Sequence, residues 1–179
     1  QLVQELLNKN TKITNNVEYD INAKTIVITM THETCLGQAP KQLVTEEKTL
    51  LTDDHFEIKI TYFKSNAGKQ APVLILLHGK GGQRRQWTGI ASFLQKNEDY
   101  SIVTVDLRGH GESPLPKKAE IKRNDYQAMV AMDLKAVKDF LMDEHIKEQL
   151  NINKLGIVAC DFAASVALVS SELDWELEP

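Results

Sequence analysis

Hydrophobic and polar residues alternate before residue 72 and stop alternating after it. Two alternating runs, Lys48–Leu51 and Phe56–Phe63, flank a polar turn at residues 52–55, and this arrangement predicts a β-hairpin. From Val73 to Leu77, five apolar residues follow one another without alternation, as expected of a strand that is covered on both faces. The pattern therefore predicts a hairpin followed by a sheet with helices on both sides.

The rest of the chain alternates strands with helices. Further strands are predicted at residues 101–107 and 155–160, and helices at about 83–97, 125–145 and 162–169. Helices between successive strands are typical of βαβ units, in which the strands run parallel. We therefore expect an α/β fold with a doubly wound, mostly parallel sheet and an N-terminal hairpin.

Near Asp161 the sequence changes from strand to helix within about one residue. An apolar run ends at Cys160, an Ala-rich stretch begins at Phe162, and no Gly, Pro or Asn lies between them. Such a turn is strained and lifts the side chain at its tip out of the sheet, in the small-x-nucleophile-x-small arrangement called a nucleophile elbow. The sequence thus predicts an elbow directly after the last strand.

Steric arguments identify the residue at the tip of this elbow. With Asp161 at the tip, the positions two before and two after it are Ala159 and Ala163, which are small enough for the backbones to touch. With Cys160 at the tip, Phe162 would occupy the second position and collide with the strand. Asp also tolerates a positive φ better than most residues. We therefore place Asp161 at the tip and interpret Cys160 as a buried structural thiol.

Residues 1–45 look like an N-terminal extension of unclear structure, and residues 46–179 form the predicted domain. Within the extension, Gln1–Asn10 is predicted to be a short amphipathic helix and Thr25–Thr31 a strand. The chain begins at Gln1 without an initiator Met or a signal peptide. It is therefore either processed or cut. An exported mature form would explain this start, and the compartment stays open.

Composition excludes several classes of function. A net charge of −4, without a basic stripe interleaved with aromatic residues, gives no electrostatic reason to expect nucleic acid as a partner. No apolar run is long enough to span a membrane. With 179 residues, the chain has enough apolar residues for the core of one domain.

The Gly-rich loop from His78 through Gly79, Lys80 and Gly81 to Gly82 directly follows a predicted buried strand. It lacks the Lys-Ser/Thr pair of a P-loop and the third glycine of a dinucleotide fingerprint, and we expect neither a cofactor nor a metal. The backbone N–H of Lys80, together with that of Phe162, would suit an oxyanion hole. The plainer interpretation is a tight turn that needs glycine for a positive φ.

Three motifs together resemble the alpha/beta-hydrolase superfamily: HGKGG at 78–82, DLRGHGES at 106–113 and VACDFAA at 158–164. The resemblance covers roughly Lys48–Leu173, with the motifs in the order of that family. It implies a structural role for the loop formed by Arg108, Gly109, His110 and Gly111. It also implies that His78 belongs to the loop framework, so that neither His78 nor His110 is expected to be a catalytic base.

The sequence departs from the family at the catalytic machinery. The family needs a nucleophile, an acid and a histidine in that order, and the last two arrive after later strands. This chain stops after the elbow helix, and His145 precedes the elbow, where it suits a helix C-terminus. We therefore expect an incomplete domain that lacks the C-terminal strands and comes from a longer gene product. If the chain really ends at Pro179, the exposed edge of the elbow strand would favour self-association.

Three functions follow from an Asp at the elbow. The favoured one is a degenerate elbow in a protein without catalytic activity, which binds a small-molecule ligand or merely folds. The second resembles haloalkane dehalogenases and epoxide hydrolases, in which an aspartate attacks carbon and the missing part supplies the rest of the triad. Its substrates would be esters, halides or epoxides, although Phe162 and Lys80-Gly81-Gly82 depart from the pattern of those enzymes. The third is a serine-type esterase or peptidase lineage that has lost its serine.

Overall fold

The computed structural model describes residues 16–20, 25–29 and 43–176. The chain divides into two compact units, Gln1–Pro40 and Lys41–Pro179. In the first unit β1 (Asn16–Asp20) pairs antiparallel with β2 (Thr25–Thr29), and β2 lies within the predicted strand. The predicted helix Gln1–Asn10 lies outside the described residues. The assignment of residues 1–45 as an extension stays a prediction.

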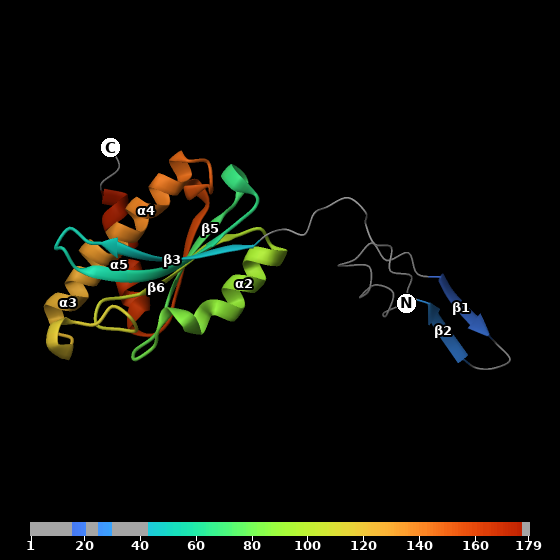
Figure 1. The fold of residues 1–179 in the computed structure, drawn as a ribbon, viewed down its shortest axis with the longest axis horizontal. Helices are drawn as coiled ribbons and strands as arrows, with labels where there is room; N and C mark the ends of the chain where they lie inside the picture. Colours follow the sequence, from blue (N-terminus) through green and yellow to red (C-terminus); the bar gives the residue numbers. More distant parts are fainter. Residues whose placement is uncertain (1–15, 21–24, 30–42, 177–179) are drawn as a thin grey trace. The chain divides into compact units, whose positions relative to one another are not determined.

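The second unit is built on a five-stranded sheet with the order β3-β4-β6-β5-β7 (Figure 1). The predicted hairpin is present as β3 (Val44–Leu51) and β4 (Glu57–Lys64), which pair antiparallel with Leu51 opposite Glu57. The other strands are β5 (Val73–Leu77), β6 (Ser101–Asp106) and β7 (Leu155–Ala159). Strand β4 runs antiparallel to β6, whereas β5 runs parallel to both β6 and β7.

The two faces of the sheet bury different side chains because successive residues of a strand point to opposite sides. On one face Val73, Ile75 and Leu77 pack with residues of the C-terminal helices in the main core. On the other face Leu76 and Ile102 pack against Ala91 of α2 (Thr88–Asn97). Strand β5 is therefore covered on both sides, as its uniform apolar run predicts.

The long helix predicted at 125–145 is present as three consecutive segments. It begins with α3 (Arg123–Ala128), passes through a π-helical turn, η4 (Met129–Asp133), and continues as α4 (Leu134–Ile146). Helix α4 buries Leu134, Val137 and Leu141 against the sheet. Within the part of the chain that the structure describes, no helix is both long and apolar enough to cross a membrane.

Strand β7 differs from expectation in its burial. The sequence predicts a buried strand, but every residue of β7 is at least partly accessible and Val158 is 42% exposed. Its open side and α5 (Phe162–Glu176) form an apolar groove of about 510 Å³, lined by Leu155, Ile157, Ala159, Ala164, Ala167, Leu168 and Ser171. Cys160 follows β7 and is exposed, so its interpretation as a buried thiol is wrong for the described structure.

Candidate functional site

The elbow has the predicted geometry. Strand β7 ends at Ala159, helix α5 begins at Phe162, and Asp161 between them has a φ of 55°. Ala163 is completely buried, as expected of the small residue on the inner side of the turn. A Cβ on Gly79 would lie 3.4 Å from the Cβ of Asp161, so the Gly-rich loop also approaches the elbow closely.

The backbone N–H of Lys80 donates a hydrogen bond to Oδ2 of Asp161 over 3.1 Å. The first turn of α5 uses other donors internally, because Ala163 donates to the carbonyl of Cys160 and Ala164 to that of Asp161. The N–H of Phe162, the second donor predicted for an oxyanion hole, belongs to the residue that opens this helix. One of the two donors predicted for an oxyanion hole is thus engaged by the elbow's own carboxylate.

The histidine of the Gly-rich loop is fixed as part of the framework. His78 is completely buried, its Nδ1 lies 2.8 Å from the carbonyl oxygen of Gly79, and its Nε2 accepts a hydrogen bond from the N–H of Leu107. Because a carbonyl can only accept, Nδ1 must carry the proton, and Nε2 is then the unprotonated nitrogen. Burial also lowers the pKa of His78, which favours this neutral form.

His110 packs in an aromatic cluster beside the elbow. Its ring stacks on that of Phe162 with the centroids 5.1 Å apart, and Nδ1 lies 3.1 Å from the carbonyl oxygen of Arg108. Tyr126 of α3 contacts the ring of Phe162 edge to face, with the ring centroids 5.7 Å apart. His78 lies 4.8 Å from His110 by ring centroids. The two histidines therefore brace the elbow, in line with the structural role that the resemblance implies.

Two buried arginines hold the loop between β6 and α3. The first, Arg108, donates from its backbone N–H, Nε and one terminal nitrogen to the carboxylate of Asp133 on the π-turn. It also donates to Asp54 in the hairpin turn and stacks over the ring of Phe56 at 4.9 Å. Hydrogen bonds from Arg108 lower the pKa of Asp54 to about 2. Burial raises the pKa of Asp133, but the three donors of Arg108 oppose this shift and favour an ion pair.

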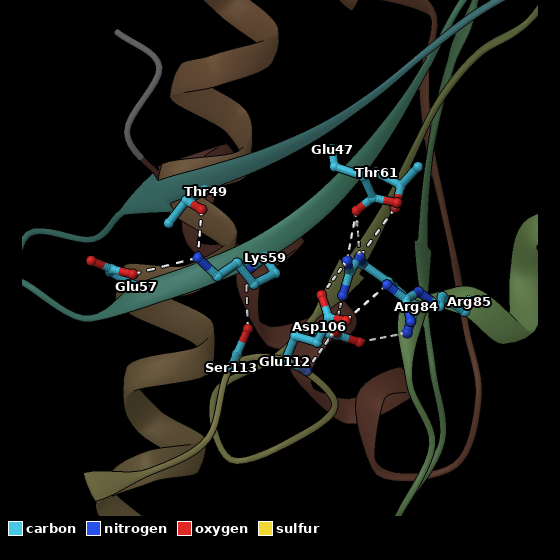
Figure 2. A network of polar contacts seen from close by, with 10 residues as sticks. All are labelled: Glu47, Thr49, Glu57, Lys59, Thr61, Arg84, Arg85, Asp106, Glu112 and Ser113. Carbon is cyan, nitrogen blue, oxygen red and sulfur yellow. Dashed lines mark hydrogen bonds and ion pairs between the residues drawn. The ribbon is translucent and has the colours of Figure 1, made fainter.

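The second, Arg84, opens the short helix η2 (Arg84–Trp87) after the Gly-rich loop (Figure 2). Its guanidinium pairs with Asp106, with Glu47 at 2.6 Å and with Glu112 at 2.7 Å, and Nε also donates to Thr61. Its backbone N–H donates to Oδ1 of Asp106 over 2.6 Å. Burial disfavours the charge of Arg84, but the surrounding carboxylates outweigh it and raise the arginine's pKa.

Sequence reasoning identified Arg108 as structural but missed Arg84 and the partners of both arginines. Arg84 is 22 residues from Asp106 and 37 from Glu47, and no local pattern links such positions. The only feature of the sequence that could have drawn attention to Arg84 is its position two residues after the Gly-rich loop. Among the described residues, the structure brings together Asp161, Lys80, Phe162, His78 and His110 at the carboxyl ends of β5, β6 and β7.

Comparisons with known proteins agree on the fold. The alpha/beta hydrolase fold family matches residues 72–169. Protein phosphatase methylesterase 1 of Mus musculus is 33% identical over 63 residues, which are 35% of this chain and 16% of the methylesterase. An abhydrolase domain-containing protein of Schizosaccharomyces pombe is 29% identical over 120 residues, covering 66% of this chain and 38% of that protein.

Two solved structures share the architecture. An esterase of Pyrococcus furiosus matches with a TM-score of 0.55 and 23% identity, over 73% of this chain and 49% of the esterase. An epoxide hydrolase of Vigna radiata matches with a TM-score of 0.54 and 22% identity, over 72% of this chain and 35% of that enzyme. The chain thus spans half or less of the length of these relatives. Because the family match covers more than half of the chain and includes all three motifs, the chain belongs to the alpha/beta-hydrolase family.

Proposed function

We propose that this chain carries a degenerate nucleophile elbow, which binds a small-molecule ligand and has no hydrolytic activity of its own. The observation that carries the proposal is the hydrogen bond from the Lys80 N–H to Oδ2 of Asp161. In a serine-type hydrolase, oxyanion-hole donors must be open to the substrate oxygen as negative charge develops on it. Here a carboxylate already engages the donor, and a second anion beside it would be repelled.

The state of the two nearby histidines supports the proposal further. Each directs its Nδ1 to a backbone carbonyl, and Nε2 of His78 already accepts from Leu107. A general base needs an acceptor nitrogen within hydrogen-bond reach of the proton that it takes. His78 has no such nitrogen to spare, and His110 is buried in its stack with Phe162.

A second candidate is a hydrolase that uses Asp161 as its nucleophile. The observation in its favour is that the described contacts engage only Oδ2, which leaves Oδ1 at the exposed tip of the elbow. Oδ1 would attack carbon, forming a C–O bond as the carbon–halogen bond breaks and the halide leaves with the bonding pair. Water would then have to cleave the resulting ester, with a base that the described residues do not supply.

Covalent trapping separates the two candidates. The protein is incubated with a primary bromoalkane, and the peptide containing Asp161 is examined by mass spectrometry. Exposed Cys160 would be alkylated as well, so the Cys160→Ser variant is the starting protein and Cys160→Ser with Asp161→Asn is its matched control. We expect no alkyl adduct on this peptide in either protein. An added alkyl mass that needs Asp161 and that hydroxylamine removes, as it removes esters but not thioethers, would contradict the proposal and favour the nucleophile.

Descent from a serine-type enzyme has its own test. If the elbow has only lost its serine, Asp161→Ser in the full-length gene product should hydrolyse p-nitrophenyl acetate faster than the wild type. The substitution also removes the carboxylate from the Lys80 N–H and so reopens the donor. Equal turnover by the two proteins would remove the idea that a serine alone is missing.

A further inference from the structure

The Gly-rich loop is held at its downstream end by Arg84. Both the backbone N–H and the guanidinium of Arg84 bind the carboxylate of Asp106, which is completely buried at the end of β6. The backbone N–H of Glu112 donates to the same carboxylate over 2.9 Å. Asp106 is therefore a fixed anchor, and Arg84 attaches the loop to it.

The upstream end of the loop is held by the sheet. Leu77 is the last residue of β5, and its carbonyl accepts a hydrogen bond from the N–H of Cys160 over 3.3 Å. Between the two ends lie three glycines, which leave the backbone unusually free to move unless both ends are fixed. Gly82 closes the turn by donating to the carbonyl of Gly79 over 3.0 Å. The direction of the Lys80 N–H therefore depends on where Arg84 is held.

We infer that Arg84 is a positioning residue for the elbow, which aims the Lys80 N–H at Asp161 by attaching the Gly-rich loop to Asp106. The inference rests on the part that Lys80 has in the proposed function. A guanidinium suits this task because its planar set of five donors can satisfy several carboxylates at once. Lysine at this position would keep the charge but not the fixed geometry of those donors.

Arg108 provides a matched control within the same chain. It is as buried as Arg84, with 4% and 3% of each residue exposed, and it also pairs with one completely buried carboxylate, Asp133. The hydrogen-bond partners of its guanidinium lie in the hairpin turn and the π-turn, and none of these partners lies in the Gly-rich loop. Loss of its geometry should disturb the fold without redirecting Lys80.

The test is amide proton exchange at Lys80, measured by NMR in Arg84→Lys, Arg108→Lys and Asp161→Ala. Asp161→Ala removes the acceptor, so exchange at Lys80 should be about tenfold faster, as expected for losing a hydrogen bond to a charged group. We expect Arg84→Lys to approach this rate and Arg108→Lys to stay at the wild-type rate. Amides of the central strands, at Ile75 and Val103, show whether the whole fold has been weakened, because global opening would accelerate them too.

The outcomes distinguish this inference from the proposed function. If Asp161→Ala leaves exchange at Lys80 unchanged, the contact behind the proposed function is not formed. If Asp161→Ala accelerates exchange at Lys80 but Arg84→Lys does not, only the positioning role is overturned. The same holds if Arg108→Lys accelerates exchange at Lys80 as much as Arg84→Lys does. Should Arg84→Lys fail to fold, Asp106→Asn weakens the same anchor while keeping its size. Faster exchange at Lys80 in that variant would support the role, and unchanged exchange would overturn it.

Discussion

Arg84 and Arg108 hold the loop between β6 and α3 from two sides, and they do so with different partners. Each is almost completely buried, and each pairs with one carboxylate that has no exposure, Asp106 or Asp133. The other carboxylates that pair with Arg84 are Glu47 of β3 and Glu112 of the loop after β6, whereas the outer partner of Arg108 is Asp54 in the hairpin turn. The comparison shows that a buried guanidinium is accommodated where converging carboxylates accept its N–H groups.

The largest loss of stability is expected when the arginine of either buried ion pair, Arg108–Asp133 or Arg84–Asp106, is removed. Arg108→Met should lower the free energy of unfolding by about 3–5 kcal/mol, because it leaves Asp133 buried without a counter-charge. Arg84→Met should cost a similar amount through Asp106. Chemical denaturation measures both, and adding Asp133→Asn to Arg108→Met should recover part of the loss. A change within about 1 kcal/mol, as for exposed pairs, would contradict the argument.

The next largest loss of stability is expected at two glycines of the loop between β6 and α3, Gly109 and Gly111. A Cβ on Gly111 would overlap the carboxylate of Asp106, while one on Gly109 would meet the flexible side chain of Ile121 at 2.8 Å. Both glycines have positive φ, which alone costs another residue about 1–2 kcal/mol. We expect Gly111→Ala to destabilise by about 3 kcal/mol, because overpacking adds to that cost, and Gly109→Ala by less. Thermal unfolding of the two variants would test this order.

A smaller effect concerns the outer partner of Arg108 and depends on pH. The pKa of Asp54 is about 2 in the folded chain and 3.8 in the reference state, so its contribution is present above about pH 4 and is lost as pH falls towards 2. Its side chain is 41% exposed, and screening should limit this contribution to about 1 kcal/mol. The difference in urea midpoint between wild type and Asp54→Asn should therefore shrink from pH 6 to pH 2.5. A constant difference would contradict this.

The smallest change in stability is expected from Glu47, an exposed ion-pair partner of Arg84. Glu47 has a side chain that is 57% exposed, and Glu47→Gln should change the free energy of unfolding by at most about 0.5 kcal/mol. The same denaturation experiment checks it. A loss as large as that of Arg84→Met would mean that burial of the partner does not decide what an ion pair contributes.

The pattern of apolar and small residues along the chain was enough to predict individual strands and the elbow. Val73–Leu77 has the predicted bounds, and Asp161 takes the positive φ expected at the tip of the elbow. The partners of Arg84 could not be predicted, because their positions along the chain are unrelated until the sheet brings them together. The exposure of Cys160 could not be predicted either, since an apolar run indicates a strand but not what packs against its edge.

The π-turn Met129–Asp133 controls the angular register of the helix around it. Each residue of an α-helix advances the side-chain direction by roughly 100°, so the wider turn rotates α3 relative to α4. On the α4 side, Leu134 and Val137 face the core, while on the α3 side Tyr126 meets Phe162. A regular helix through this region would present those side chains at a different relative angle. By changing the angle, the π-turn lets one helix pack against the core at one end and against the elbow at the other.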